Sequence, residues 1–124
     1  MNNLPCNAPF EYLVLDVKFC GVDIRTGKSA VLLLFMDAYT GIVFHSQYTT
    51  QTGKGVLVKF LRYICNKYNF DNLKINFKLI TAIDEPFEDI LNLFLPNATE
   101  IIFNANLSNQ LCDRVRPKYV NMIP

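Results

Sequence analysis

The sequence predicts an α/β protein built on a mixed five-stranded sheet flanked by helices, and two observations predict it. Three apolar segments within residues 11–49 are separated by turn-forming residues, which indicates three successive antiparallel strands. After them, segments with helical spacing alternate with short strand-like segments, as in β-α-β crossovers. The predicted order is therefore β-β-β-α-β-α-β-α, with three antiparallel strands followed by crossovers.

Size and composition set the class of protein. With 124 residues, of which 51% are hydrophobic, the chain is long enough for one domain with a real core. We expect residues 1–10, which contain Pro5 and Pro9, to form an irregular lead-in, and residues 11–124 to form a single domain. The longest apolar run, residues 30–36, is far shorter than the ~20 residues of a membrane span. We expect a cytoplasmic protein that does not contact a membrane.

The first half of the chain reads as a meander. Residues 11–19 are rich in β-branched and aromatic side chains and predict a strand, and residues 21–28, with Asp23 and Gly27, predict a turn. Residues 29–36 predict a deeply buried second strand. A short reversal over residues 37–41 then leads to a third strand over residues 42–49.

In the second half of the chain the spacing of the apolar residues changes, and helical segments alternate with strands. A helix that begins near Thr52 or Gly53 is predicted by one apolar stripe, formed by Leu57, Phe60, Leu61, Ile64 and Tyr68. Alternation over residues 74–81 predicts a fourth strand. Pro86 is placed where a first helical turn tolerates it, which indicates a helix over residues 85–94. A fifth strand over residues 99–103 and a helix over residues 106–114 complete the chain.

Asp16 is the most unusual residue of the first strand. It interrupts an otherwise apolar run. Burying an unpaired carboxylate costs several kcal/mol, so we expect a cation, hydrogen-bond donors or a metal beside it. A meander followed by crossovers places the first strand centrally and the fourth beside it. We therefore expect Asp16 and Asp84, which follows the fourth strand, to share one cleft at the strand ends.

Converging carboxylates of this kind suit Mg²⁺ or Mn²⁺, which prefer oxygen ligands. The sequence thus predicts a divalent-metal site with Asp16 and Asp84 as ligands and Asp37 in a supporting role. Three simpler interpretations stay open. Asp16 can be a strand-end acid paired with Lys or Arg, Asp37 can start the reversal through its side chain, and Asp84 can favour a helix N-terminus.

Cations gather along the first predicted helix. Lys54, Lys59, Arg62 and Lys67 occur there without an acid between them, although the net charge of the whole chain is only +1. Together with Lys18 in the first strand they predict a phosphate-binding surface for nucleic acid. The alternative is a solvated helix face that aids solubility. Four cysteines without CxxC spacing do not predict a zinc site.

Three segments of the sequence resemble the catalytic core of bacterial insertion-sequence transposases and retroviral-type integrases. They are residues 13–16, residues 33–41 and residues 79–81 leading to Asp84, with residues 95–98 before the fifth strand as a weaker fourth. The resemblance covers residues 11–116 and implies a ribonuclease-H-like fold. It also implies metal-dependent cutting and joining of DNA, with Asp16 as the first acid and Asp84 as the best match to the second.

The chain departs from that pattern at several positions. Ala82 is nearer than Asp84 to the place of the second acid, and Asn104 and Leu107 stand where an Asp and a His are expected. Asp113 is the only acid after Glu100, and no acid in this tail matches the third ligand of the pattern. Three interpretations follow: an incomplete transposase core that lacks the last acid, a non-catalytic ribonuclease-H-like interaction module, or a different small α/β nuclease that uses the same cleft. DNA is the expected partner, and a homodimer is a further expectation.

Overall fold

A five-stranded mixed sheet forms the centre of the molecule. The computed structural model describes residues 6–51, 53–69, 75–113 and 115. The strands are β1 (Tyr12–Val22), β2 (Ser29–Asp37), β3 (Val43–Thr49), β4 (Phe77–Thr81) and β5 (Ala98–Phe103). Their order in the sheet is β3-β2-β1-β4-β5, with β1 central, as expected. The strands β1, β2 and β3 pair antiparallel, whereas β4 is parallel to both β1 and β5.

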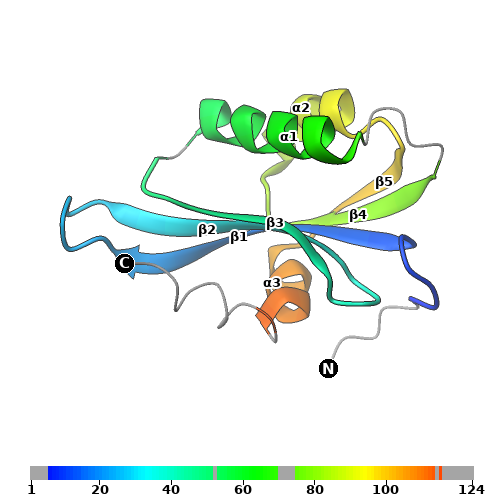
Figure 1. Cartoon of the computed structure of the whole chain (residues 1–124), viewed down its shortest axis with the longest axis horizontal. Helices are drawn as coiled ribbons and strands as arrows, with labels where there is room; N and C mark the ends of the chain where they lie inside the picture. The colour runs from blue at the N-terminus through cyan, green and yellow to red at the C-terminus, as the bar shows by residue number, and fades with distance from the viewer. Residues whose placement is uncertain (1–5, 52, 70–74, 114, 116–124) are drawn as a thin grey trace.

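Helices cover both faces of this sheet. Helix α1 (Lys54–Tyr68), the 3₁₀ turn η1 (Glu85–Phe87) and α2 (Glu88–Phe94) pack on one face, and α3 (Ala105–Asp113) packs on the other (Figure 1). Alternate residues of β1 serve the two faces, because neighbouring side chains of a strand point in opposite directions. Leu13 and Leu15 join the cluster under α1 and α2, whereas Tyr12 and Val14 join the cluster under α3.

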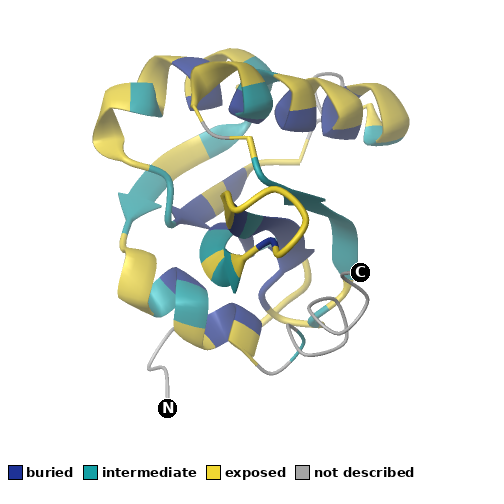
Figure 2. Ribbon diagram, turned by 90° about the vertical axis from the view of Figure 1, so that its left-hand side faces the viewer, coloured by how far each residue is buried: buried dark blue, intermediate teal, exposed yellow. Residues whose placement is uncertain are grey.

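Burial follows the predicted apolar stripes. The inner side of α1 buries Leu57, Phe60, Leu61 and Ile64, and its outer side is exposed. Figure 2 shows the same division on the helices that cover the sheet, with buried residues turned toward the strands. Among the described residues, no side chain caps the N-terminus of helix α1; the residue before it, Gly53, has φ +102°, which glycine adopts with little strain.

Most predicted element boundaries agree with the structure within one residue, and three differ by more or in form. Strand β1 extends to Val22, past a bulge between Phe19 and Gly21, so the predicted turn over residues 21–28 is shorter than expected. The predicted helix over residues 85–94 divides into η1 and α2. Strand β4 begins at Phe77, and Lys74 lies outside the described residues.

Other predictions fall on parts of the chain that the structure does not describe. Half of the lead-in, residues 1–5, lies outside the described residues, as do Thr52, Arg114 and the basic tail from residue 116 onward. Within the described part, no helix has the length and apolar character needed to cross a lipid bilayer.

Candidate functional site

Asp16 lies in the central strand, fully buried, and its side chain faces α3. Its Oδ1 atom accepts a hydrogen bond of 2.6 Å from the hydroxyl of Ser108, which is also fully buried. Ser108 precedes Leu111 and Cys112 by three and four residues, so it lies on the buried stripe of α3. Asp16 is therefore joined to α3 in the core, and its Oδ1 partner is a serine rather than the Lys or Arg expected for a strand-end acid.

The residue that directly follows β4, next to Leu15 of β1, is Ala82 rather than an acid. Leu15 pairs with Thr81, and the backbone N–H of Ala82 donates to the carbonyl of Leu15 at 3.1 Å. The Thr81 hydroxyl donates to the same carbonyl at 2.8 Å and accepts from the N–H of Ile83 at 3.0 Å. These bonds fix the chain where it leaves β4, so that Ala82 is directly beside Asp16.

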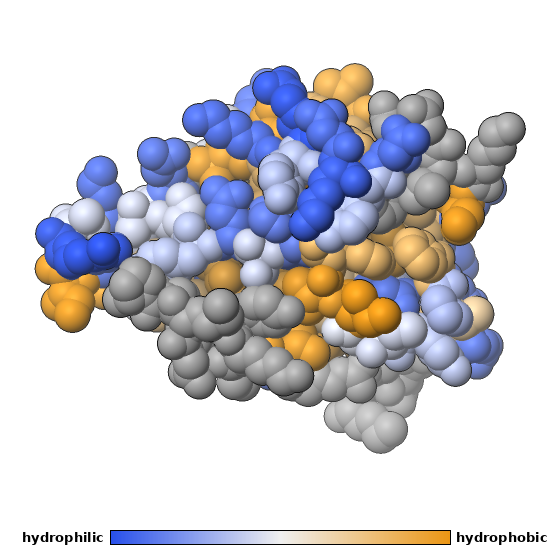
Figure 3. Space-filling view, in the orientation of Figure 1, coloured by the Kyte–Doolittle hydropathy of each residue, from blue (hydrophilic) through white to orange (hydrophobic). Residues whose placement is uncertain are grey.

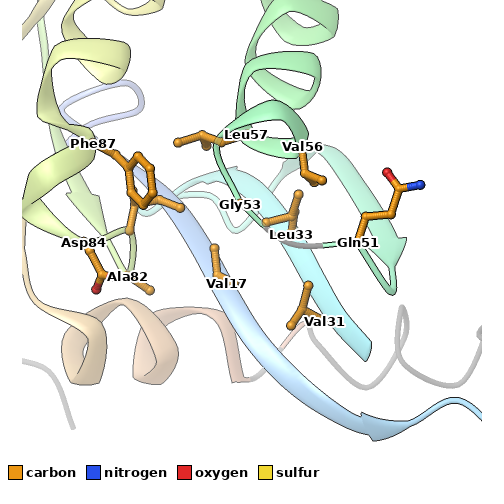
Figure 4. A pocket seen from close by; sticks show the side chains of 11 residues that line it. Val17, Val31, Leu33, Gln51, Gly53, Val56, Leu57, Ala82, Asp84 and Phe87 are labelled. Atoms are coloured by element: carbon orange, nitrogen blue, oxygen red, sulfur yellow. The ribbon is translucent and has the colours of Figure 1, made fainter. Parts of the chain in front are cut away.

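Asp84 lies two residues beyond Ala82, in the exposed segment between β4 and η1. It borders a cavity of about 180 Å³ on the α1 side of the sheet, whose walls are mostly apolar (Figure 4). The figure shows the ring of Phe87 turned toward Leu57 and the Asp84 carboxylate turned away from the apolar walls. Parallel pairing thus brings the loop with Asp84 to the strand end near Asp16, but Asp16 itself points to α3.

Asp37 has the contacts of a turn residue. Its Oδ1 accepts from the backbone N–H of Phe10 at 3.0 Å, and its Oδ2 accepts from the N–H and the hydroxyl of Thr40 at 3.1 and 2.7 Å. Along β2 it is opposite Leu13, whereas Leu34 is opposite Asp16, so about 10 Å of strand separates the two acids. These contacts support the turn role that the sequence left open.

The three predicted metal ligands are not assembled into one cluster among the described residues. Among them, no group of three or more His, Cys, Asp or Glu side chains is close enough together to hold an ion. A hydroxyl occupies Oδ1 of Asp16, and both oxygens of Asp37 accept backbone or hydroxyl donors. Metal roles for Asp16, Asp84 and Asp37 remain predictions from the sequence.

The sequence prediction did not include Ser108. The sequence nevertheless indicates that Ser108 is buried, because it precedes Leu111 and Cys112 by three and four residues and so shares the apolar side of the helix. Asn104, which replaces an acid of the family pattern, caps the same helix: its Oδ1 accepts from the N–H of Leu107 at 3.0 Å. The junction after β5 is thus specified by structural contacts.

The cations of α1, called the cation row below, are spread over the exposed part of the helix, with Arg62 toward Phe94 of α2 and Lys67 toward Tyr63 and Tyr68. Lys54, Lys59, Arg62 and Lys67 are all exposed, and none of the ion pairs among the described residues includes them. Figure 3 shows hydrophilic side chains gathered along this side of the molecule. Hydrogen bonding to Tyr68, with smaller contributions from Tyr63, raises the pKa of Lys67, so its charge is secure at neutral pH.

Lys18 does not belong to that row. It extends from β1 on the α3 side, and its Nζ atom lies 3.2 Å from Oδ1 of Asp113. The structure therefore brings together four of the predicted phosphate-binding cations and separates the fifth, which is on the other face of the sheet.

No family model and no curated protein sequence matches this chain. One solved structure, described as the Mos1 transposase catalytic domain and raltegravir with Mg, is similar to it with a TM-score of 0.57. The identity is 12%, and the match covers 92% of this chain and 63% of that one. This chain thus spans less than two thirds of the chain it matches. At this identity the similarity concerns the fold, which is ribonuclease-H-like.

Proposed function

We propose that this chain is a transposase-like core domain that binds DNA, and that its described residues form no metal-dependent cleavage site. The ribonuclease-H-like fold shared with a transposase catalytic domain supports the first part. The single observation that carries DNA binding is the exposed cation row on α1, which has no carboxylate partner among the described residues.

Two features favour a non-catalytic role over strand cleavage. Asp16, which the resemblance assigns as the first acid, is fully buried and joined to Ser108. Ala82, which cannot bind a metal through its side chain, follows β4 and is hydrogen-bonded to Leu15, the residue before Asp16. Asp16 could reach DNA only if the core opened and exposed the apolar residues around it. The folded domain therefore keeps this carboxylate away from DNA.

Binding to a short duplex, followed by fluorescence anisotropy over a series of salt concentrations, tests the proposal. The double variant K59A/R62A should lower the slope of log affinity against log salt by about 2, because each lost phosphate contact removes about one unit. The matched control is K18A, which removes a cation from the opposite face and should leave the affinity unchanged. Duplex binding that K18A weakens and K59A/R62A does not would overturn the proposed surface.

Calorimetry with Mn²⁺ tests the second part. We expect no binding heat that distinguishes the natural chain from D16N, which keeps the size of the side chain and removes its charge. A saturable heat in the natural chain that D16N abolishes would instead support Asp16 and Asp84 as metal ligands. Light scattering on the DNA complex would test the homodimer expected from the sequence.

A further inference from the structure

A groove between α1 and α2 lies apart from the candidate acids and has a volume of about 460 Å³. That is within the range of pockets that hold small organic ligands. Its lining comes from the middle of α1 and the end of α2, and consists of Arg62, Cys65, Asn66, Leu93 and Phe94. It opens beside the cation row, on the side of the sheet that α1 and α2 cover (Figure 1).

One wall of the groove is apolar and open to solvent. Leu93 is 73% exposed, although it is a large aliphatic side chain on a short helix. The ring of Phe94 is next to it, and the guanidinium carbon of Arg62 lies 6.0 Å from the centre of that ring. A ligand that covers Leu93 and Phe94 would remove this apolar surface from water.

The opposite wall is polar. Arg62 and Asn66 line it, and Lys59 precedes Arg62 by three residues, so the three side chains lie on one stripe of α1 that runs into the groove. Neither the Arg62 guanidinium nor the Asn66 carboxamide has a hydrogen-bonding partner among the described residues. The stripe therefore offers positive charge for phosphate and, from the amide of Asn66, both a donor and an acceptor.

We propose that this groove holds an unpaired nucleobase of single-stranded DNA, with its base against Leu93 and Phe94 and the flanking phosphates on Lys59 and Arg62. The inference rests on the proposed DNA binding and specifies the form of the DNA. Bases of an intact duplex are stacked and paired, so a duplex can reach the cations but not the apolar wall. Aromatic and apolar walls beside a basic track are typical of single-strand binding.

Three fluorescent probes of equal length test this: a single strand, an abasic strand with the same phosphates, and a duplex. We expect the natural chain to bind the single strand roughly 5-fold to 100-fold more tightly than the abasic strand, the range that stacking of one base provides. The variant L93S should remove this preference and leave the abasic affinity unchanged. Its matched control is I24S, at a residue that is 96% exposed in the β1–β2 turn and should change nothing.

The outcomes separate this inference from the function on which it rests. Equal affinity for the single and abasic strands, unaffected by L93S, would overturn the base-binding groove while DNA binding stands. Failure of all three probes to bind would overturn DNA binding itself, and the groove with it. Displacement of the single strand by an acidic peptide containing phenylalanine, with affinity that L93S reduces, would assign the groove to a protein partner and overturn the inference.

Discussion

The buried pair formed by Asp16 and Ser108 shows how a single polar contact can join two layers of this molecule. The two residues are 92 positions apart, and both are fully buried. A carboxylate in a core is stable only where donors compensate for its lost hydration. Ser108 supplies one such donor from α3, so the contact fixes α3 on the central strand.

Removing this donor should destabilise the fold. We expect S108A to lower the free energy of unfolding by about 1–3 kcal/mol, because the buried Asp16 side chain loses a hydrogen-bond partner. Urea unfolding of S108A, D16N and the double variant measures the coupling between the two side chains. A matched control is S46A, on the half-buried strand β3, which should change stability little. Strictly additive losses would contradict a direct role for the pair.

Single elements show where local sequence was sufficient and where it was not. The reversal after β2 follows from Asp37 and Thr40, whose side chains satisfy the turn within four residues. The segment after β4 is different: Pro86 fits the first turn, as expected, but the chain forms a 3₁₀ turn before α2 begins at Glu88. Local sequence thus predicts the position of a turn better than the exact form of a helix start.

The junction of β3 and α1 gives a pH-dependent prediction. The ring of His45 lies 4.3 Å from that of Tyr63 and 5.3 Å from that of Phe60, measured between centroids. Burial, and secondarily the charge of Lys67, lowers the pKa of His45. The folded state therefore favours the neutral ring, and this part of the stability is present above the ordinary value of about 6.5 and is lost as the pH falls below it.

Thermal melting between pH 5.5 and 7.5 tests that sign. The natural chain should lose stability toward the acidic end of this window, whereas H45Q, which cannot be protonated, should show a flatter profile. Carboxylates titrate mainly below the window, so they contribute little to the difference. A melting temperature of the natural chain that rises on acidification, relative to H45Q, would contradict the assignment.

On the scale of the whole molecule, two apolar layers share one sheet. One lies beneath α1 and α2 and includes Leu61; the other lies beneath α3 and includes Leu111. Because alternate residues of β1 and β2 serve both layers, neither layer can form without the sheet that the other also buries. We infer that the domain unfolds as one unit.

Substitution in either layer should therefore have a similar effect. L61A and L111A should each lower the free energy of unfolding by about 2–5 kcal/mol, the usual cost of removing a buried leucine side chain. Each variant should still unfold in one transition, so that circular dichroism and fluorescence give coincident curves. Tyrosine supplies the fluorescence because the chain contains no tryptophan. Two separate transitions in L111A would show that the layers fold independently.

The sequence by itself determined the element order, the central position of β1 and the apolar stripe of α1. These follow from local period and from connection rules, which need only the chain itself. It also identified Asp16 as a residue that needs a partner. Only the tertiary structure decided which partner that is, since Ser108 is brought to it by the packing of α3. Tertiary structure likewise divided the predicted cations between two faces and opened a groove between α1 and α2. Such contacts depend on how elements distant in the chain pack together, and no local pattern specifies that packing.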